Sequence, residues 1–268
     1  MQIMAATDFS TRASRALRQA GLLAQQKLSD LHVVHVVDDD QPEGLVRLER
    51  LEAERLLLEQ LEAMPELQGI RCHPKVVTGD TFDGILRTAV QLSADLLVMG
   101  AHRKQLLLDV LIGTTLERVI RSSSFPVLVV NNPIPRSYES VVAAVDMSEA
   151  SASALRIGAA RGLVRSGTTI LHAFTAMAKG RMLVDGIDPA TVDKYITDER
   201  QTFRRDEGGP IEIISHAVSE LRPDLLVMGT RGRSRLLKTL IGSVTDEALR
   251  LLDVDILVVP PAPSSPAS

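Results

Sequence analysis

Short runs of strand-forming residues alternate with longer amphipathic segments along the chain. In the first half these runs lie at residues 2–6, 33–37, 73–78, 96–99 and 127–131. The segments between them repeat apolar residues at intervals of three and four, as at Ala13, Ala16, Leu17 and Ala20, which is the spacing of one helix face. The pattern predicts five strands, with helices over residues 10–27, 45–63, 83–92 and 114–122. Strands that alternate with helices are typical of βαβ units around a parallel sheet covered on both faces.

The second half repeats the first. Residues 95–100, Asp-Leu-Leu-Val-Met-Gly, recur unchanged at residues 224–229, and the residues around Asp8 match those around Asp146. The repeat indicates a duplicated domain rather than a solenoid of short repeats. It predicts strands at residues 140–145, 168–173, 225–228 and 256–259. The remaining strand falls on residues 203–207, Phe-Arg-Arg-Asp-Glu, and we expect it to be short or distorted because it is poor in strand formers.

The fold class expected from this repeat is α/β, with two tandem open-sheet domains. Each domain has a five-stranded parallel sheet with helices on both faces, in a Rossmann-like arrangement. We expect the first domain at residues 1–135 and the second at residues 136–261, with Pro133 and Pro135 breaking the chain between them. Residues 262–268 are rich in proline and serine, so they predict a disordered tail.

Composition narrows the possible partners. The net charge is -4, tryptophan is absent and aromatic residues make up 3%, so neither a basic field nor stacking platforms favour nucleic acid. No apolar run approaches the roughly 20 residues of a membrane helix, and the N-terminus lacks the pattern of a signal peptide. The lone Cys72 excludes an intramolecular disulfide and is expected to be an ordinary strand-edge cysteine. We therefore expect a cytoplasmic protein without nucleic-acid or membrane partners.

A glycine-containing loop follows the repeated strand in the second half. Gly229 and Gly232 are separated by two residues, and nine further residues lead to Gly242 and Ser243. Glycine lets backbone N–H groups approach an anion closely, and the start of a helix favours phosphate. We expect Ser243 to be both the N-cap and a hydroxyl donor. The alternative is a plain strand-to-helix connection with capping glycines. Three arginines add positive charge to the loop: Arg231, Arg233 and Arg235.

This spacing resembles the ATP-binding motif of the universal stress protein family. The likeness covers about residues 1–260 as a tandem of two domains, and it includes Ala-Thr-Asp-Phe-Ser at residues 6–10 and the segment that begins at Ser124. The resemblance implies a fold like that of the adenine nucleotide alpha hydrolases. It also implies ATP as the ligand, with Mg²⁺ carried on the phosphates, chiefly in the second domain.

The implied binding residues follow from the motif position by position. In the second domain they are Ala144, Val145, Asp146, Ala173, Met228, Gly229, Arg231, Gly232, Arg233, Gly242, Ser243, Val244 and Thr245. The weaker candidates in the first domain are Thr7, Asp8, Val36, Gly100, Arg103, Gly113 and Thr114. Arg103 stands where the motif has its second glycine, so it either obstructs the phosphates or supplies a cation. Asp8 and Asp146 have an alternative role as helix N-caps, and His35 and His172 are expected to be packed strand residues.

The sequence favours a nucleotide-dependent regulator of the stress response. No paired acid and base, activated nucleophile or protein metal site is present, and the acidic residues 38–40 are expected to form a solvated loop. Two other hypotheses remain. One is an interaction module without nucleotide, and the other is a slow ATPase or autophosphorylating protein that uses Ser243 or Thr245. The resemblance also implies pairing of the final edge strands, residues 127–131 and 256–261, within the chain and in a homodimer, and regulation implies an unknown protein partner.

Overall fold

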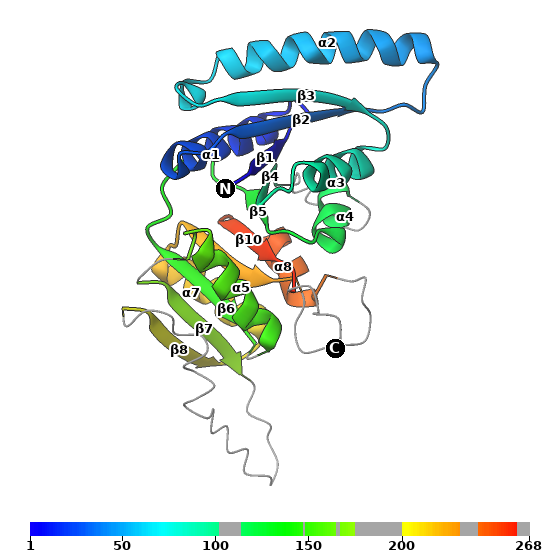
Figure 1. Ribbon diagram of the computed structural model, residues 1–268. Helices are drawn as coiled ribbons and strands as arrows, with labels where there is room; N and C mark the ends of the chain where they lie inside the picture. Colours follow the sequence, from blue (N-terminus) through cyan, green and yellow to red (C-terminus); the bar gives the residue numbers. More distant parts are fainter. Residues whose placement is uncertain (102–113, 147, 165–166, 175–199, 231–240, 262–268) are drawn as a thin grey trace, which may run out of the picture. The chain divides into compact units, whose positions relative to one another are not determined.

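A computed structural model describes residues 1–101, 114–146, 148–164, 167–174, 200–230 and 241–261 (Figure 1). The chain divides into two compact units, Met1–Ser137 (unit 1) and Tyr138–Ser268 (unit 2). The predicted tail lies outside the described residues.

Unit 1 has the alternating strands and helices predicted from the hydrophobic pattern. In chain order these are β1 (Ile3–Ala6), α1 (Thr11–Lys27), β2 (Leu31–Val37), α2 (Glu43–Glu62), a short 3-10 helix (Pro65–Leu67), β3 (Cys72–Thr78), α3 (Thr81–Gln91), β4 (Leu96–Gly100), α4 (Thr115–Ser122) and β5 (Val127–Val130). The strands pair in the order β3-β2-β1-β4-β5, and every pairing is parallel. The predicted five-stranded parallel sheet is confirmed.

Unit 2 repeats this arrangement in the part of it that the structure describes. The elements are β6 (Val141–Val145), α5 (Glu149–Ala160), β7 (Thr169–Phe174), β8 (Thr202–Glu207), α7 (Pro210–Leu221), β9 (Leu225–Gly229), α8 (Ser243–Leu251) and β10 (Asp255–Val259). Its strands pair in the order β10-β9-β6-β7-β8, again all parallel. The α/β fold predicted for both halves is therefore present.

The direction of strand addition reverses once in each unit. In unit 1, β2 and β3 are added on one side of β1, whereas β4 and β5 are added on the other. Because parallel crossovers are right-handed, this reversal places α1 and α2 on one face of the sheet and α3 and α4 on the opposite face. The central strands are consequently buried on both faces, and all four residues of β1 are buried.

The first helix shows how local sequence sets the elements. Ser10 is the N-cap of α1, and its hydroxyl accepts a hydrogen bond from the Ala13 backbone N–H at 3.2 Å. The predicted apolar face is buried: Ala13, Ala16, Leu17, Ala20, Leu23 and Ala24. Burial of this face holds α1 against the sheet and fixes where its first turn lies.

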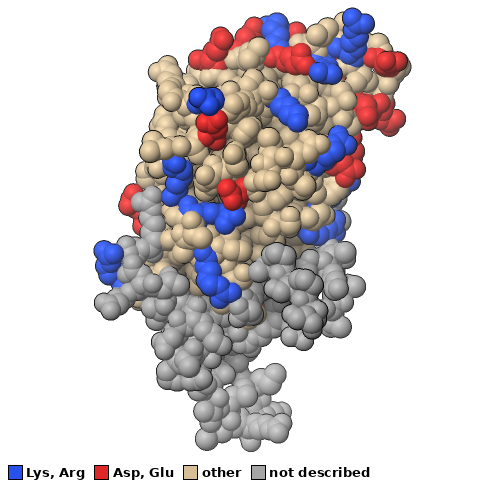
Figure 2. Space-filling model, in the orientation of Figure 1, with Lys and Arg blue, Asp and Glu red and all other residues tan. Residues whose placement is uncertain are grey.

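Helix α2 is the leucine-rich, charged helix expected over residues 45–63. Residues of both charge signs alternate along its outer surface (Figure 2), and Arg50 pairs with Glu54 at 3.0 Å. Arg55 pairs with Glu52 one turn before it and with Glu59 one turn after it. Such i,i+3 and i,i+4 pairs support an exposed helix by a few tenths of a kcal/mol each.

The prediction that residues 203–207 form a short or distorted strand is wrong. Strand β8 spans six residues and pairs with β7 in continuous parallel register from Thr202 to Glu207. It lies at the outer side of its sheet, where charged side chains reach solvent. Arg204 lies 2.7 Å from the Asp206 carboxylate and 2.8 Å from the Glu220 carboxylate. Pairing with β7 and these ion pairs outweigh the poor strand propensity.

Cys72 begins β3 and is half-buried. Burial, with a smaller contribution from the Asp30 charge, raises the pKa of its thiol, which disfavours the reactive thiolate. In the described residues, no helix combines the length and apolar character needed to cross a membrane.

Two helical glycines give a test of packing on α1. A Cβ added at Gly21 would lie 2.9 Å from the Glu66 carbonyl oxygen, whereas one at Gly44 on α2 would meet nothing within 4 Å. We predict that Gly21→Ala lowers the free energy of unfolding by about 1–3 kcal/mol, because a backbone contact must shift. The matched control Gly44→Ala should be neutral or stabilise by up to about 1 kcal/mol. Urea denaturation followed by circular dichroism measures both, and equal effects would contradict the packing argument.

Candidate functional site

Each unit has a cleft at the carboxyl ends of its central strands. The cleft of unit 1 has a volume of about 510 Å³ and that of unit 2 about 350 Å³. Both lie where the direction of strand addition reverses, between β1 and β4 in unit 1 and between β6 and β9 in unit 2. Open parallel sheets bind ligands at this position, and both volumes suit a small organic molecule.

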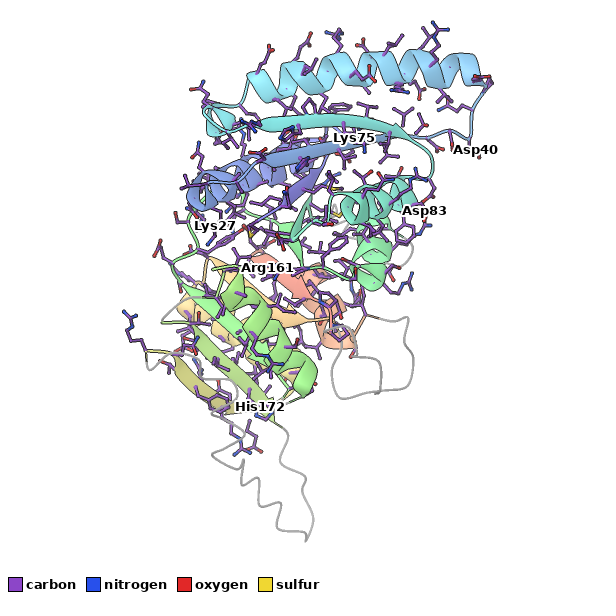
Figure 3. The ribbon with its side chains drawn as sticks, viewed as in Figure 1. Lys27, Asp40, Lys75, Asp83, Arg161 and His172 are labelled. Atoms are coloured by element: carbon purple, nitrogen blue, oxygen red, sulfur yellow. The ribbon has the colours of Figure 1, made fainter. Side chains whose placement is uncertain are left out.

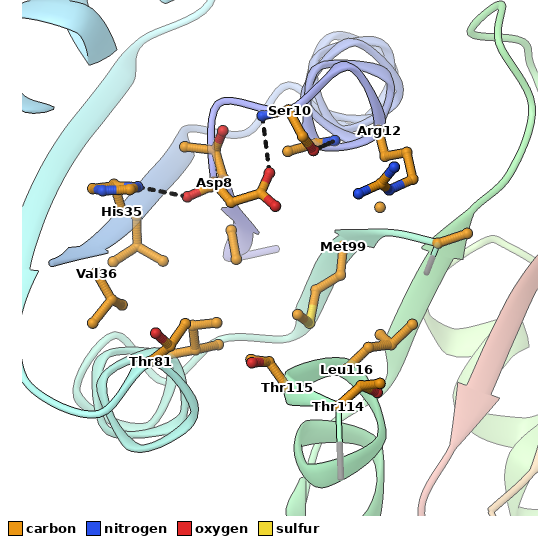
Figure 4. Close-up of a pocket in the computed structure, with 17 residues that line it drawn as sticks. Asp8, Ser10, Arg12, His35, Val36, Thr81, Met99, Thr114, Thr115 and Leu116 are labelled. Carbon is orange, nitrogen blue, oxygen red and sulfur yellow. Dashed lines mark hydrogen bonds between the residues drawn. The ribbon is translucent and has the colours of Figure 1, made fainter. Parts of the chain in front are cut away.

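In unit 1, the cleft is lined by strand ends and by the first turns of α1, α3 and α4 (Figure 4). Five of the residues expected from the sequence line it: Thr7, Asp8, Val36, Gly100 and Thr114. Arg103 and Gly113 lie outside the described residues. Arg12, Thr81, Ile85 and Thr115 also line the cleft but were not expected. Their placement depends on how the helices pack on the sheet, which a linear motif does not show.

In unit 2, most of the expected residues lie together. Ten line the cleft: Ala144, Val145, Asp146, Ala173, Met228, Gly229, Gly242, Ser243, Val244 and Thr245. Arg231, Gly232 and Arg233 lie outside the described residues. Ser151, Leu171, Pro210 and Ile214 line it as well and were not expected. Comparison of the repeats could have found Ile214, because it stands 129 positions after Ile85.

The loop after β1 is fixed by its own hydrogen bonds. The Phe9 N–H donates to the Thr7 hydroxyl at 3.1 Å, and the Ser10 N–H donates to the Asp8 carboxylate at 2.9 Å. Phe9 adopts a left-handed conformation with φ 61°. Since Ser10 caps α1, the alternative that Asp8 is the N-cap is wrong. Asp8 instead uses one carboxylate oxygen to hold the loop at the edge of the cleft.

His35 on β2 contacts the same loop. Its Nδ1 lies 2.8 Å from the Thr7 carbonyl oxygen, which can only accept, so Nδ1 carries the proton. Its ring centroid lies 4.4 Å from that of Phe9. His35 is thus packed against the loop, as expected, and it also lines the cleft. His172 is buried on β7 near the strand's carboxyl end (Figure 3).

The equivalent loop in unit 2 has more polar contacts. Asp146 accepts hydrogen bonds from the Ser148 N–H at 3.1 Å, from the Ser148 hydroxyl at 2.6 Å and from the Ser151 hydroxyl. Ser148 is the N-cap of α5, so the N-cap alternative is wrong for Asp146 too. In unit 1 the position of Ser151 is occupied by Ala13. The hydrogen bonds that orient Asp8 and Asp146 therefore differ between the two clefts.

The start of α8 corrects another expectation. Gly242, not Ser243, is the N-cap, and no side-chain hydrogen bond caps this helix. Gly242 already accepts from the Asp246 N–H at 2.9 Å and donates to the Thr230 carbonyl oxygen at 2.9 Å, so the chain enters the helix one residue earlier than predicted. Ser243 is exposed at the cleft. Thr245 is buried, and its hydroxyl donates to the Gly229 carbonyl oxygen at 2.9 Å, which anchors α8 to the end of β9.

Gly100 is required for packing of the sheet against α1. A Cβ at this position would lie 2.7 Å from the carbonyl carbon and oxygen of Arg12. The first glycine of the sequence motif therefore lets the end of β4 approach the first turn of α1. This contact also brings the Arg12 residue next to the cleft.

The family follows from a comparison of the sequence with known families. A sequence model described as the universal stress protein family matches residues 1–131 and again residues 137–260. The chain belongs to this family. Its two matches correspond to the two halves of the duplication, so it is a tandem universal stress protein.

Relatives of this tandem universal stress protein match single units. Universal stress protein MJ0531 of Methanocaldococcus jannaschii is 31% identical over 140 residues, which cover 49% of this chain and 82% of the relative. Universal stress protein MJ0577 of the same organism is 25% identical over 151 residues, which cover 48% and 93% respectively. A universal stress protein from Archaeoglobus fulgidus matches both units with a TM-score of 0.75 and 19% identity, covering 96% of this chain and 98% of that one. This last likeness shows the fold.

The anchor of α8 gives a test that separates the two repeats. We predict that Thr245→Val lowers the free energy of unfolding by about 1–2 kcal/mol, because the Gly229 carbonyl loses a buried donor. The control is Thr115→Val at the start of α4, where Val244 stands at the equivalent position of unit 2. That change should cost less than about 0.5 kcal/mol. Urea denaturation compares the two variants, and a larger loss in Thr115→Val would contradict the assignment.

Proposed function

We propose that this universal stress protein binds ATP, mainly in the cleft of unit 2, and acts as a nucleotide-dependent regulator of the stress response. The observation that carries the proposal is the convergence of ten motif-implied residues on that cleft. They come from β6, β7, β9 and the start of α8, which are far apart in the sequence.

The cleft of unit 2 offers different chemistry at its two ends. Leu171, Ala173, Ile214 and Met228 supply apolar walls that suit a planar base. The Asp146 carboxylate is an acceptor that suits the amino group of adenine. At the other end, α8 begins at Ser243 after its N-cap Gly242, and the backbone N–H groups of its first turn lack partners within the helix. These groups and the positive end of the helix dipole favour phosphate.

The residues between β9 and α8 complete the proposed site. Gly232 would let the backbone approach the phosphates, and Arg231 and Arg233 would add positive charge, as the family motif implies. Mg²⁺ would be carried on the phosphates. We assign no catalytic residue, so any hydrolysis would be slow and incidental to binding.

A nucleotide-dependent regulator must interact with other molecules in a way that depends on whether nucleotide is bound. We include in the proposal a cytoplasmic location, a homodimer through the final strands β5 and β10, and a regulatory protein partner. Strand β5 is an outermost strand in the strand order of unit 1, and β10 is an outermost strand in that of unit 2. Backbone groups at such positions favour strand pairing.

Isothermal titration of the full chain with Mg-ATP tests nucleotide binding directly. We predict saturable binding that weakens at least tenfold in Gly232→Arg, because a side chain there obstructs the approach of the backbone to phosphate. The control is Gly44→Arg, which adds the same charge on α2 where an added Cβ meets nothing within 4 Å. It should bind as the unchanged protein does. Absence of binding in a chain with intact circular dichroism would refute the proposed function.

A further inference from the structure

The side chain of Arg12 lines the cleft of unit 1 from the first turn of α1 (Figure 4). It is half-buried, and among the described residues it forms no hydrogen bond or ion pair. Several other arginines of unit 1 have carboxylate partners, such as Arg18 with Glu66 at 3.2 Å and Arg118 with Asp80 at 3.3 Å. A guanidinium without a partner at the wall of a cleft is available to an anion that enters the cleft.

The cleft of unit 1 is lined by groups of different chemistry. Gly100 at the end of β4 lies against the Arg12 backbone. The start of α4 lines the same cleft, where Thr114 is the N-cap and Thr115 follows it. Figure 4 shows the Asp8 side chain between His35 and Arg12, and Val36 on the same side of the cleft as His35. A cation beside a helix start suits an anionic group, and a carboxylate beside apolar residues suits a base with an amino group. The cleft therefore offers a cation for an anionic group and an acceptor for a base that carries an amino group.

The sequence of unit 2 places no cation at the corresponding position. Ala150 stands where unit 1 has Arg12, and the next residue, Ser151, hydrogen-bonds Asp146. Unit 2 has the complete glycine motif instead. In unit 1, Arg103 interrupts that motif. The two repeats thus differ in sequence at two places: in the glycine loop and in the first turn of the first helix.

We propose that the cleft of unit 1 is a second nucleotide site, in which Arg12 binds the phosphates in place of the glycine loop. The inference rests on the proposed function for the class of ligand. A planar guanidinium donates two parallel hydrogen bonds to phosphate and needs no close approach of backbone. Because a fixed side-chain charge supplies the attraction, affinity at this site rises with the number of phosphates, from AMP through ADP to ATP.

The variant Arg12→Gln tests this assignment in the full chain. Isothermal titration of the unchanged protein should show two sites per chain for ATP, and Arg12→Gln should weaken one of them roughly 10- to 100-fold, as expected for loss of a charged hydrogen bond. The loss should be greater for ATP than for AMP. Arg12→Lys, which keeps the charge but loses the paired donors, should bind more tightly than Arg12→Gln and less tightly than the unchanged protein. The matched control is Arg15→Gln, on the same helix but outside the cleft lining, and it should leave both sites unchanged.

Photolabelling with 8-azido-ATP identifies which unit holds each site. We expect labelled peptides from both units in the unchanged protein, and loss of the label within residues 1–137 in Arg12→Gln. Two sites that persist unaltered in Arg12→Gln would overturn the inference. A single site that Gly232→Arg abolishes would also overturn it while leaving the proposed function intact. No nucleotide binding in the unchanged protein would overturn both.

Discussion

Parallel pairing around a single reversal of strand order is the constraint on which both clefts depend. Parallel strands present their carboxyl ends at one edge, and the reversal beside β1 and β6 sends the following helices to opposite faces of the sheet. A gap therefore opens between helices that would otherwise pack side by side. Helix starts and the loops after the strands surround this gap, so polar backbone groups and short side chains converge there.

Duplication preserves this geometry while the chemistry of the two clefts differs. Ile85 and Ile214, and likewise Met99 and Met228, occupy equivalent positions in the two linings. The polar positions have diverged: Ala13 corresponds to Ser151, and Leu116 to the Thr245 that anchors α8. The apolar walls define a similar space in both units. The polar differences give the two clefts different linings on one fold.

Much of the fold could be predicted from the sequence, because buried strands and helix faces leave periodic signals. The repeat at residues 95–100 and 224–229 became β4 and β9, and the apolar face of α1 was buried as expected. Strand β8 was misjudged, since its parallel pairing with β7 and the ion pair of Arg204 with Glu220 on α7 are not visible in local propensity. The cap of α8 was misplaced by one residue because Gly242 and Ser243 are both acceptable N-caps, and backbone contacts decide between them.

The site was less predictable than the fold. Motif residues such as Asp146 and Gly229 could be named from spacing, because the family pattern is linear in sequence. Arg12 could not, since its place at the cleft depends on the close contact between α1 and Gly100. A residue that reaches a site through tertiary packing leaves no signal in a motif.

The central claim is that a nucleotide lies at the reversal of strand order. A crystal structure of the full chain grown with Mg²⁺ and a non-hydrolysable ATP analogue tests it most directly. The account predicts density in unit 2 for a base between Asp146 and Ala173 and for phosphates at Gly242 and Ser243. Nucleotide bound elsewhere, with this cleft empty at saturating ligand, would contradict it.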